Sequence, residues 1–181
     1  MDKPKVIVIC GPTASGKTAL SIELAKKING EIISSDSMQI YKYMDVGTAK
    51  PTQEEMQGIQ HYLLDFVEPN QRYSVAEFKK DAEKAIEQIL AKGKVPIIVG
   101  GTGLYVDSLI YGIEYQDIKL DENYRAELEK RVEKEGLETL YIEAQKIDSQ
   151  AVEKISENDK KRILRILEIY HATGKNKTEQ E

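Results

Sequence analysis

One short segment constrains the fold of this chain more than any other: Gly11-Pro12-Thr13-Ala14-Ser15-Gly16-Lys17-Thr18. It matches the G-x-x-x-x-G-K-[ST] pattern, and it lies where that pattern requires, between an apolar stretch and a helix-like stretch. The glycines allow consecutive N–H groups to face one anion, and the following helix adds unpaired donors and a positive dipole end. We expect Lys17 to bring a charge to the terminal phosphates and Thr18 to offer a hydroxyl to a magnesium ion. The segment therefore predicts a polyphosphate or diphosphate site.

Strands and helices alternate over the first two-thirds of the chain. This pattern predicts an α/β fold of the P-loop NTPase type, a parallel sheet with flanking helices. Apolar runs predict strands at residues 5–10, 31–35, 61–66 and 95–99. Residues 47–53 are expected to form a loop.

Helices are expected from the phosphate-binding segment to Ile28, from the N-cap Ser74 to Gly93, and over residues 102–111. In the second helix, apolar residues recur at spacings of three and four, which is typical of one buried face. These residues are Val75, Phe78, Ala82, Ile86 and Ile89.

The amino-acid composition changes after Gly112. Residues 121–170 are rich in Glu and Lys, hold Gly136 as their only glycine and contain no proline. They predict three or four short helices. We therefore expect a P-loop core over residues 1–113 and a small helical insertion domain over residues 114–181.

Composition narrows the possible functions. The net charge of −5 argues against bulk electrostatic binding of nucleic acid, so such a role would need a local basic face. We expect no signal peptide, and no apolar run approaches bilayer length. Cys10 is the only cysteine, which favours the reducing cytoplasm, and its place at a strand end favours a core role over that of a nucleophile.

The expected strands place further polar groups beside the phosphate-binding segment. Asp36 follows one strand and Gly100-Gly101-Thr102 follows another, and parallel strands open onto one crevice at their carboxyl ends. A nucleotide hydrolase normally has an acid after an apolar strand to support magnesium, but the strand at 95–99 ends in two glycines. Asp36 could support the metal, act as a base toward a second substrate, or only cap a helix. Gln39 offers the donor and acceptor pair that reads an adenine edge, although a surface amide is the commoner role.

In sequence, the chain resembles the tRNA dimethylallyltransferase (IPP transferase) family. The matching segments are GPTASGKT at 11–18, SSDSMQIY at 34–41, DVGTAKP at 45–51, HYLLD at 61–65, YSVAEF at 73–78, GGTGLY at 100–105 and NDKKRILRILE at 158–168. They follow family order over nearly the whole chain. Family members continue well past the position of Thr173-Gly174, so the resemblance implies a truncated chain that lacks part of the core.

The resemblance implies transfer of a dimethylallyl group from dimethylallyl diphosphate to the N6 amine of the adenosine 3′ to the anticodon, in tRNAs that read codons starting with U. Residues 11–18 would hold the diphosphate with Mg²⁺, and Asp36 would be the base. Thr13 and Thr102 match positions near the diphosphate and the target base. The implied partners are dimethylallyl diphosphate and the tRNA anticodon stem-loop, and we expect a monomer.

The resemblance also implies contacts with tRNA. The implied residues are Asp36, Ser37, Met38, Gln39, Thr102, Arg125, Lys161, Arg162 and Arg165. The last three share a face of one expected helix, with Ile163, Ile166 and Tyr170 on the opposite side. A phosphate-contacting face is the interpretation we favour over a solvated charged face.

Three alternatives stay open. A small-molecule P-loop kinase would require ATP turnover, and the missing acid after Val99 counts against it. An adenylate isopentenyltransferase would act on free adenine nucleotides without helical tRNA contacts. A third possibility is that the chain only binds diphosphate, and we expect residues 1–181 alone to modify tRNA weakly or not at all.

Overall fold

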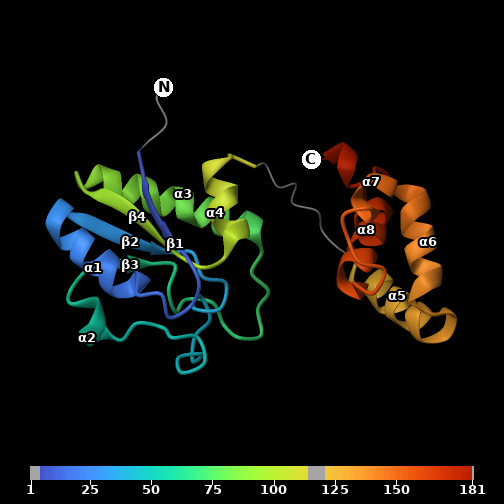
Figure 1. The fold of residues 1–181 in the computed structure, drawn as a ribbon, viewed down its shortest axis with the longest axis horizontal. Coiled ribbons are helices and arrows are strands. Elements are labelled where there is room, and N and C mark those ends of the chain that lie inside the picture. The colour runs from blue at the N-terminus through green and yellow to red at the C-terminus, as the bar shows by residue number, and fades with distance from the viewer. Residues whose placement is uncertain (1–4, 114–120, 181) are drawn as a thin grey trace. The chain divides into compact units, whose positions relative to one another are not determined.

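The structure is a computed structural model that describes residues 5–113 and 121–180. The described residues form two compact units, residues 5–113 and residues 121–180, each with its own hydrophobic core (Figure 1). Within the described residues, the helices are too short or too polar to cross a bilayer.

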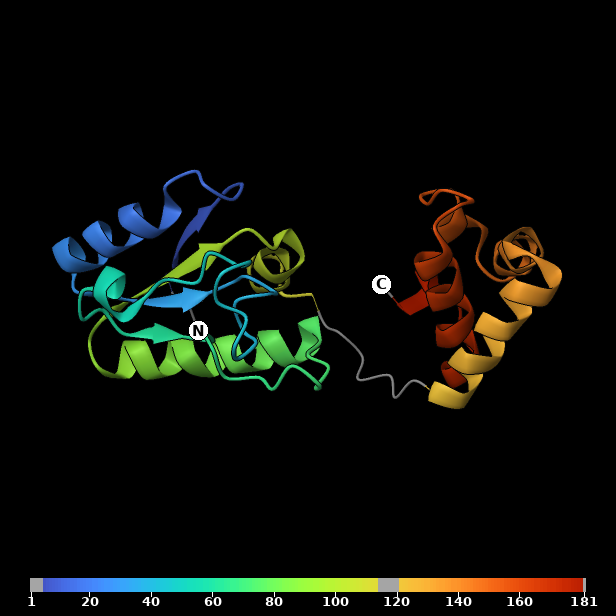
Figure 2. The same ribbon diagram turned by 90° about the horizontal axis from the view of Figure 1, so that it is seen from below.

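The first unit is built on a parallel sheet with the strand order β1-β4-β2-β3. The strands are β1 (Ile7–Cys10), β2 (Gly30–Ser34), β3 (His61–Tyr62) and β4 (Val95–Gly100). Helix α1 (Lys17–Ile28) covers one face, and α3 (Val75–Ala91) and α4 (Gly103–Ile110) cover the other (Figures 1 and 2). This arrangement confirms the expected α/β fold with a parallel sheet and flanking helices.

Successive residues of the central strands β2 and β4 belong to two hydrophobic cores, one on each face of the sheet. Ile32 and Ile97 pack against Ile22 and Ala25 of α1. Their neighbours on the other face, Ile33 and Ile98, pack with the α3 stripe, in which Phe78, Ala82 and Ile89 are fully buried. Because both faces of the sheet are covered, residues of its central strands that point to either face are buried, without the alternation of a one-sided sheet.

Local signals set the helix ends. Ser74 forms a capping box with Glu77: its hydroxyl accepts from the Glu77 N–H at 3.2 Å, and Glu77 accepts from the Ser74 N–H at 2.7 Å. Helix α1 ends at Asn29 with φ of 55°, a conformation that Asn tolerates better than most residues.

Three expectations for this unit are corrected. The third strand ends at Tyr62 instead of reaching residue 66, because Leu63 and Asp65 adopt φ of 56° and 57°, which breaks the extended conformation. The expected loop at 47–53 leads into a short helix, α2 (Gln53–Met56), which begins with a Thr52–Glu55 capping box. Cys10 is exposed rather than part of the core, since β1 lies at the sheet edge with β4 as its neighbour.

The second unit contains four helices, the upper end of the expected range: α5 (Glu122–Glu135), α6 (Leu137–Ile147), α7 (Ser149–Val152) and α8 (Lys160–Thr173). Leu128, Leu140, Ile163 and Leu164 form the fully buried centre of its core. A 3₁₀ turn, η1 (Thr178–Gln180), follows. Asp148 accepts from the N–H and the hydroxyl of Thr178 at 2.8 and 2.6 Å, so the polar end of the chain is bound to the helices.

A buried carboxylate joins the sheet to the end of α3. The Glu31 side chain is 5% exposed and accepts hydrogen bonds from Lys94 at 2.7 Å, the Tyr62 hydroxyl at 2.8 Å and Lys92 at 3.0 Å. Burial alone would raise the pKa of Glu31, but these donors lower it to about 2. The charged form is therefore the one that stabilises the fold.

Glu31→Gln is expected to lower the free energy of unfolding at pH 7 by roughly 2 kcal/mol, because the amide keeps the shape but loses the charge. A carboxyl whose pKa is lowered on folding stabilises the fold above its unfolded pKa and loses that effect as pH falls through its folded pKa. The difference from the unsubstituted chain should shrink between pH 4.5 and about 2. Urea denaturation at several pH values measures it. A difference independent of pH over this interval would contradict the assignment.

Candidate functional site

A cleft in the first unit lies at the carboxyl ends of its strands. It has a volume of about 480 Å³. Its lining includes Thr13, Ala14, Ser15, Gly16, Lys17, Thr18, Asp36, Gln39, Thr48, Ala49, Glu55, Gln57 and Gly100. Most of the predicted phosphate-binding segment thus shares one cavity with Asp36 and Gln39.

The phosphate-binding segment leaves its donors available. Gly16 has φ of 84° and precedes α1, whose first turn has no side-chain cap. Lys17 bends back over the loop, and its Nζ donates to the Pro12 carbonyl at 2.6 Å. Because a helix N-terminus without a cap has unpaired N–H groups, this side of the cleft suits an anion. We call the segment at 11–18 and the start of α1 the phosphate-binding wall.

Asp36 follows β2 and is half-buried. Its Oδ1 accepts from the backbone N–H groups of Met38 at 2.9 Å and Gln39 at 3.2 Å. The carboxylate therefore caps a turn, not a helix, and this turn fixes its orientation. Within residues 5–113 and 121–180, Oδ2 makes no hydrogen bond, so it is left to accept a proton or a ligand.

Thr102 and Ser37 connect two of the strand ends. The Thr102 Oγ1 accepts from the Ser37 N–H at 3.0 Å and donates to the Ser37 hydroxyl at 3.3 Å. The Thr102 N–H donates to the Ser35 carbonyl at 3.2 Å. The structure thus places Thr102 beside the Asp36 segment but uses its hydroxyl to hold that segment.

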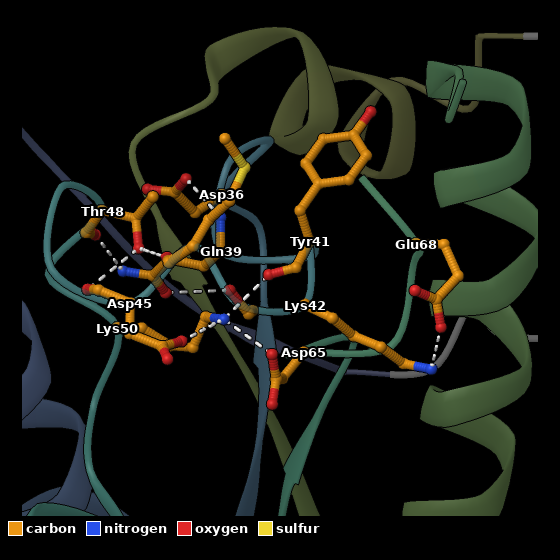
Figure 3. Close-up of polar contacts among 11 residues, drawn as sticks. Asp36, Gln39, Tyr41, Lys42, Asp45, Thr48, Lys50, Asp65 and Glu68 are labelled. Atoms are coloured by element: carbon orange, nitrogen blue, oxygen red, sulfur yellow. Dashed lines mark hydrogen bonds and ion pairs between the residues drawn. The ribbon is translucent and has the colours of Figure 1, made fainter. Parts of the chain in front are cut away.

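Gln39 is also engaged within the protein (Figure 3). Its Nε2 donates to the carbonyls of Thr48 at 3.0 Å and Ala49 at 3.2 Å, and its Oε1 accepts from the Ser34 hydroxyl at 3.4 Å. An amide with both ends paired is not free to read an adenine edge in this conformation. Contact between Gln39 and a base stays a prediction.

Among the cleft residues that were not identified as site residues from the sequence, four come from outside the phosphate-binding segment, α1 and the sheet: Thr48, Ala49, Glu55 and Gln57. The only signal for the first two was the segment DVGTAKP at 45–51, which entered through the resemblance. Glu55 and Gln57 belong to α2 and its end, and no local pattern marks them as functional.

Magnesium fits the oxygen groups of the cleft. The Thr18 hydroxyl and the Asp36 carboxylate both line it, and hard oxygen donors are what Mg²⁺ takes. The described residues contain no group of three or more His, Cys, Asp or Glu that could hold a metal ion. A magnesium ion here would therefore depend on substrate phosphate oxygens and water for its other ligands.

The predicted tRNA-contacting residues of the second unit differ in their surroundings. Arg125 pairs with Glu129 at 3.0 Å and with the buried Glu168 at 3.3 Å, so its guanidinium is part of the unit's own structure. On α8, Lys161 and Arg162 are exposed and Arg165 is half-buried.

The apolar side of α8 largely follows the expectation. Ile163 and Ile166 are buried, but Tyr170, expected beside them, is 44% exposed. The side of α8 that packs on the unit's core is continued by Leu164 and Leu167.

Comparisons with known proteins agree on one family. The family model described as IPP transferase matches residues 39–181. The chain belongs to the IPP transferase family. Its curated relatives include tRNA dimethylallyltransferases from Acetivibrio thermocellus, 56% identical over 94% of the chain, and from Bacillus anthracis, 49% identical over 99%. The chain spans 54% and 57% of the length of these two relatives.

Solved structures support the same membership. The full-length tRNA isopentenylpyrophosphate transferase of Bacillus halodurans is 47% identical, with a TM-score of 0.63 over 96% of this chain and 57% of its own. A eukaryotic dimethylallyltransferase acting on tRNA is 38% identical, with a TM-score of 0.80 over 98% of this chain and 44% of its own.

Gly100 of this IPP transferase chain occupies a position that only glycine fits. A Cβ there would collide with the carbonyl oxygen and the hydroxyl of Ser35, whereas a Cβ at Gly101 would meet only the Gly11 carbonyl at 3.4 Å. We expect Gly100→Ala to lower the free energy of unfolding by about 1–3 kcal/mol through overpacking, and Gly101→Ala to change it little. Thermal or urea denaturation of the two variants measures the difference, and equal effects would contradict the close approach of β4 to Ser35.

Arg125→Met is expected to lower the free energy of unfolding by about 2 kcal/mol, because it removes the ion pair of Arg125 with the buried Glu168 carboxylate. Arg162→Met serves as the matched control, since Arg162 is exposed and its ion pair among the described residues is with Asp159, three residues away. Denaturation followed by helix content measures both. If the two variants lost equal stability, Arg125 would have no special structural role.

Proposed function

We propose that this chain contributes the diphosphate site and the base of a tRNA dimethylallyltransferase. The enzyme would transfer a dimethylallyl group from dimethylallyl diphosphate to the N6 amine of the adenosine 3′ to the anticodon. The observation that carries the proposal is that Lys17, Thr18 and Asp36 line one cleft. The names of the relatives, tRNA dimethylallyltransferases, support it.

The phosphate-binding wall assists departure of the diphosphate. As the allylic C–O bond breaks, negative charge grows on the leaving oxygens, and donors placed there stabilise the transition state more than the ground state. Lys17 would leave the Pro12 carbonyl and follow that charge, together with the N–H groups of the α1 N-terminus. When bound, Mg²⁺ would supply further positive charge to the same oxygens.

Asp36 serves the other substrate. The adenine N6 attacks the allylic carbon, and its N–H becomes more acidic as the new C–N bond forms. Asp36 then accepts that proton. Its Oδ1 is held by the Met38 and Gln39 N–H groups, so Oδ2 is the oxygen left for the proton.

We assign recognition of the anticodon stem-loop to two regions. Residues 36–39 and Thr102 lie at the carboxyl end of the sheet, and the α8 residues Lys161, Arg162 and Arg165 offer charges for phosphates. We propose the cytoplasm as the location of this reaction. Arg125 supports this region through Glu168, and a direct contact with RNA is the weaker assignment for it.

The proposed division of the chain is a P-loop core over residues 1–113 and a helical insertion over residues 114–181. β1 pairs on one side with β4 and its residues are only partly covered. Its other edge is where a further strand of a longer chain would pair.

Lys17→Ala should weaken binding of a non-hydrolysable dimethylallyl diphosphate analogue with Mg²⁺ by at least about tenfold, because a charge-assisted contact is lost. Lys27→Ala is the control: it removes the same charge from the exposed far end of the same helix. Asp36→Asn should lose less affinity than Lys17→Ala, because its amide keeps an oxygen for Mg²⁺. Titration calorimetry on the 181-residue chain measures all three, and equal loss in both lysine variants would contradict the assigned site.

The transfer step is tested in a chimera, in which residues 1–181 of this chain replace the matching segment of the Bacillus anthracis relative. The chimera is incubated with Mg²⁺, dimethylallyl diphosphate and an anticodon stem-loop, with AMP and ATP in parallel. We expect the mass increase of one dimethylallyl group on the RNA alone, and its loss in Asp36→Asn. Modification of AMP would favour the adenylate isopentenyltransferase, and ATP consumption without prenylation would favour the kinase.

A further inference from the structure

Lys50 is a buried cation beside the cleft. Its side chain is 6% exposed. Its Nζ donates to Asp45 Oδ1 at 2.7 Å, Asp65 Oδ1 at 2.7 Å and the Tyr41 carbonyl at 2.8 Å (Figure 3). An ammonium group has three N–H donors, so all of them are used.

The charge of Lys50 is maintained by these partners. Burial alone would lower the pKa of Lys50, but the hydrogen bonds and charges of Asp45 and Asp65 raise it above its usual value. The group is therefore an ammonium at neutral pH. It is not among the residues that line the cleft. With its donors occupied inside the protein, Lys50 is not placed to bind a phosphate.

The contacts of Lys50 join segments that are distant in sequence. Asp45 belongs to the loop before it, and Asp65 follows the short strand β3. The Asp65 N–H in turn donates to the Gln39 carbonyl at 3.0 Å. One ammonium group thus connects the loop at 45–50, and the Tyr41 carbonyl before it, to the end of the third strand.

That loop carries the carbonyls that hold Gln39. Thr48 and Ala49 immediately precede Lys50, and both accept from the Gln39 side chain. The Gln39 N–H then donates to Asp36 Oδ1 at 3.2 Å. A continuous set of hydrogen bonds therefore leads from Lys50 through the loop and Gln39 to the Asp36 carboxylate (Figure 3).

We propose that Lys50 is a positioning residue, which holds the loop at 45–50 against Gln39 and thereby fixes the orientation of the Asp36 carboxylate in the cleft. The catalytic meaning of this orientation rests on the proposed function. The mechanical coupling does not, since it concerns the chain without substrate. Release of the loop would free the Gln39 amide and loosen the turn that Asp36 caps.

The same segment offers a matched control. Lys42 forms an ion pair with Glu68 at 2.6 Å, its side chain is 36% exposed, and neither residue bonds to the loop at 45–50 (Figure 3). Lys50→Met and Lys42→Met remove the same charge eight positions apart. Only the first breaks the connection to Gln39.

The test is hydrogen exchange, resolved by residue, on the full 181-residue chain without ligand. In Lys50→Met, the Met38 and Gln39 amides should exchange at least about tenfold faster, because their acceptor is no longer held in place. The β4 amides should keep their rates, which distinguishes positioning from general loss of stability. Lys42→Met should leave the Met38 and Gln39 amides unchanged.

A second variant keeps the test decisive if Lys50→Met fails to fold. The Asp45 side chain is 65% exposed, so Asp45→Asn removes one charged acceptor of Lys50 at little structural cost. It should accelerate the same two amides by a smaller factor. Unchanged Met38 and Gln39 exchange in the folded variants, or equal acceleration in Lys42→Met, would overturn the proposal.

Affinity for the Mg²⁺-bound dimethylallyl diphosphate analogue separates this proposal from the proposed function. Lys50→Met should bind it within about twofold of the unsubstituted chain, because the phosphate-binding wall does not involve Lys50. A loss as large as that of Lys17→Ala would mean that Lys50 acts on the diphosphate, which would also overturn the positioning role. Failure of the unsubstituted chain to bind the analogue would count against the proposed function and leave the exchange result standing.

Discussion

The parallel pairing of β2 with β4 is the constraint on which the cleft depends. All residues of β2 are buried, and β4 lies between β2 and β1. Because the two strands run the same way, they end at one edge, and their pairing continues past the strands in the bond from Ser35 N–H to the Val99 carbonyl at 2.8 Å. The packing of the core, and not contacts made within the cleft, therefore places Asp36 near the phosphate-binding segment.

This dependence explains which parts of the fold could be predicted from sequence. Strands buried on both faces appear as apolar runs, and the helix ends at Ser74 and Asn29 have short-range signals. The end of β3 had no such signal. Residues 61–66 have the composition of a strand, but Leu63 and Asp65 take positive φ, and the Asp65 contacts with Gln39 and Lys50 are made across the fold. A pattern confined to neighbouring residues cannot represent them.

The candidate site also divides into residues that local patterns predicted and residues whose surroundings only the fold shows. Lys17, Thr18 and Asp36 were identified because a motif and a strand end are local features, and the structure brings them together. For Gln39 and Thr102 the sequence supplied the residue type but not the occupancy of the side chain. Their partners are 9 or 10 and 65 residues away, so only the folded chain shows that both are engaged. An amide or hydroxyl near a site is informative about binding only once its internal hydrogen bonds are known.

The two walls of the cleft differ in how far their polar groups are satisfied, and this difference supports the roles proposed for them. The phosphate-binding wall has an uncapped helix N-terminus and a lysine held by a single carbonyl, so an anion gains contacts there that the protein has not already made. Gln39 in the opposite wall and Lys50, which does not line the cleft, are both fully paired, and binding a ligand through them would first break existing bonds. Within that wall, the Asp36 carboxylate is the group that is both held in place and still able to accept a proton. Orientation before the substrate arrives avoids reorganisation during the reaction, which is the condition under which a fixed carboxylate is most effective as a base.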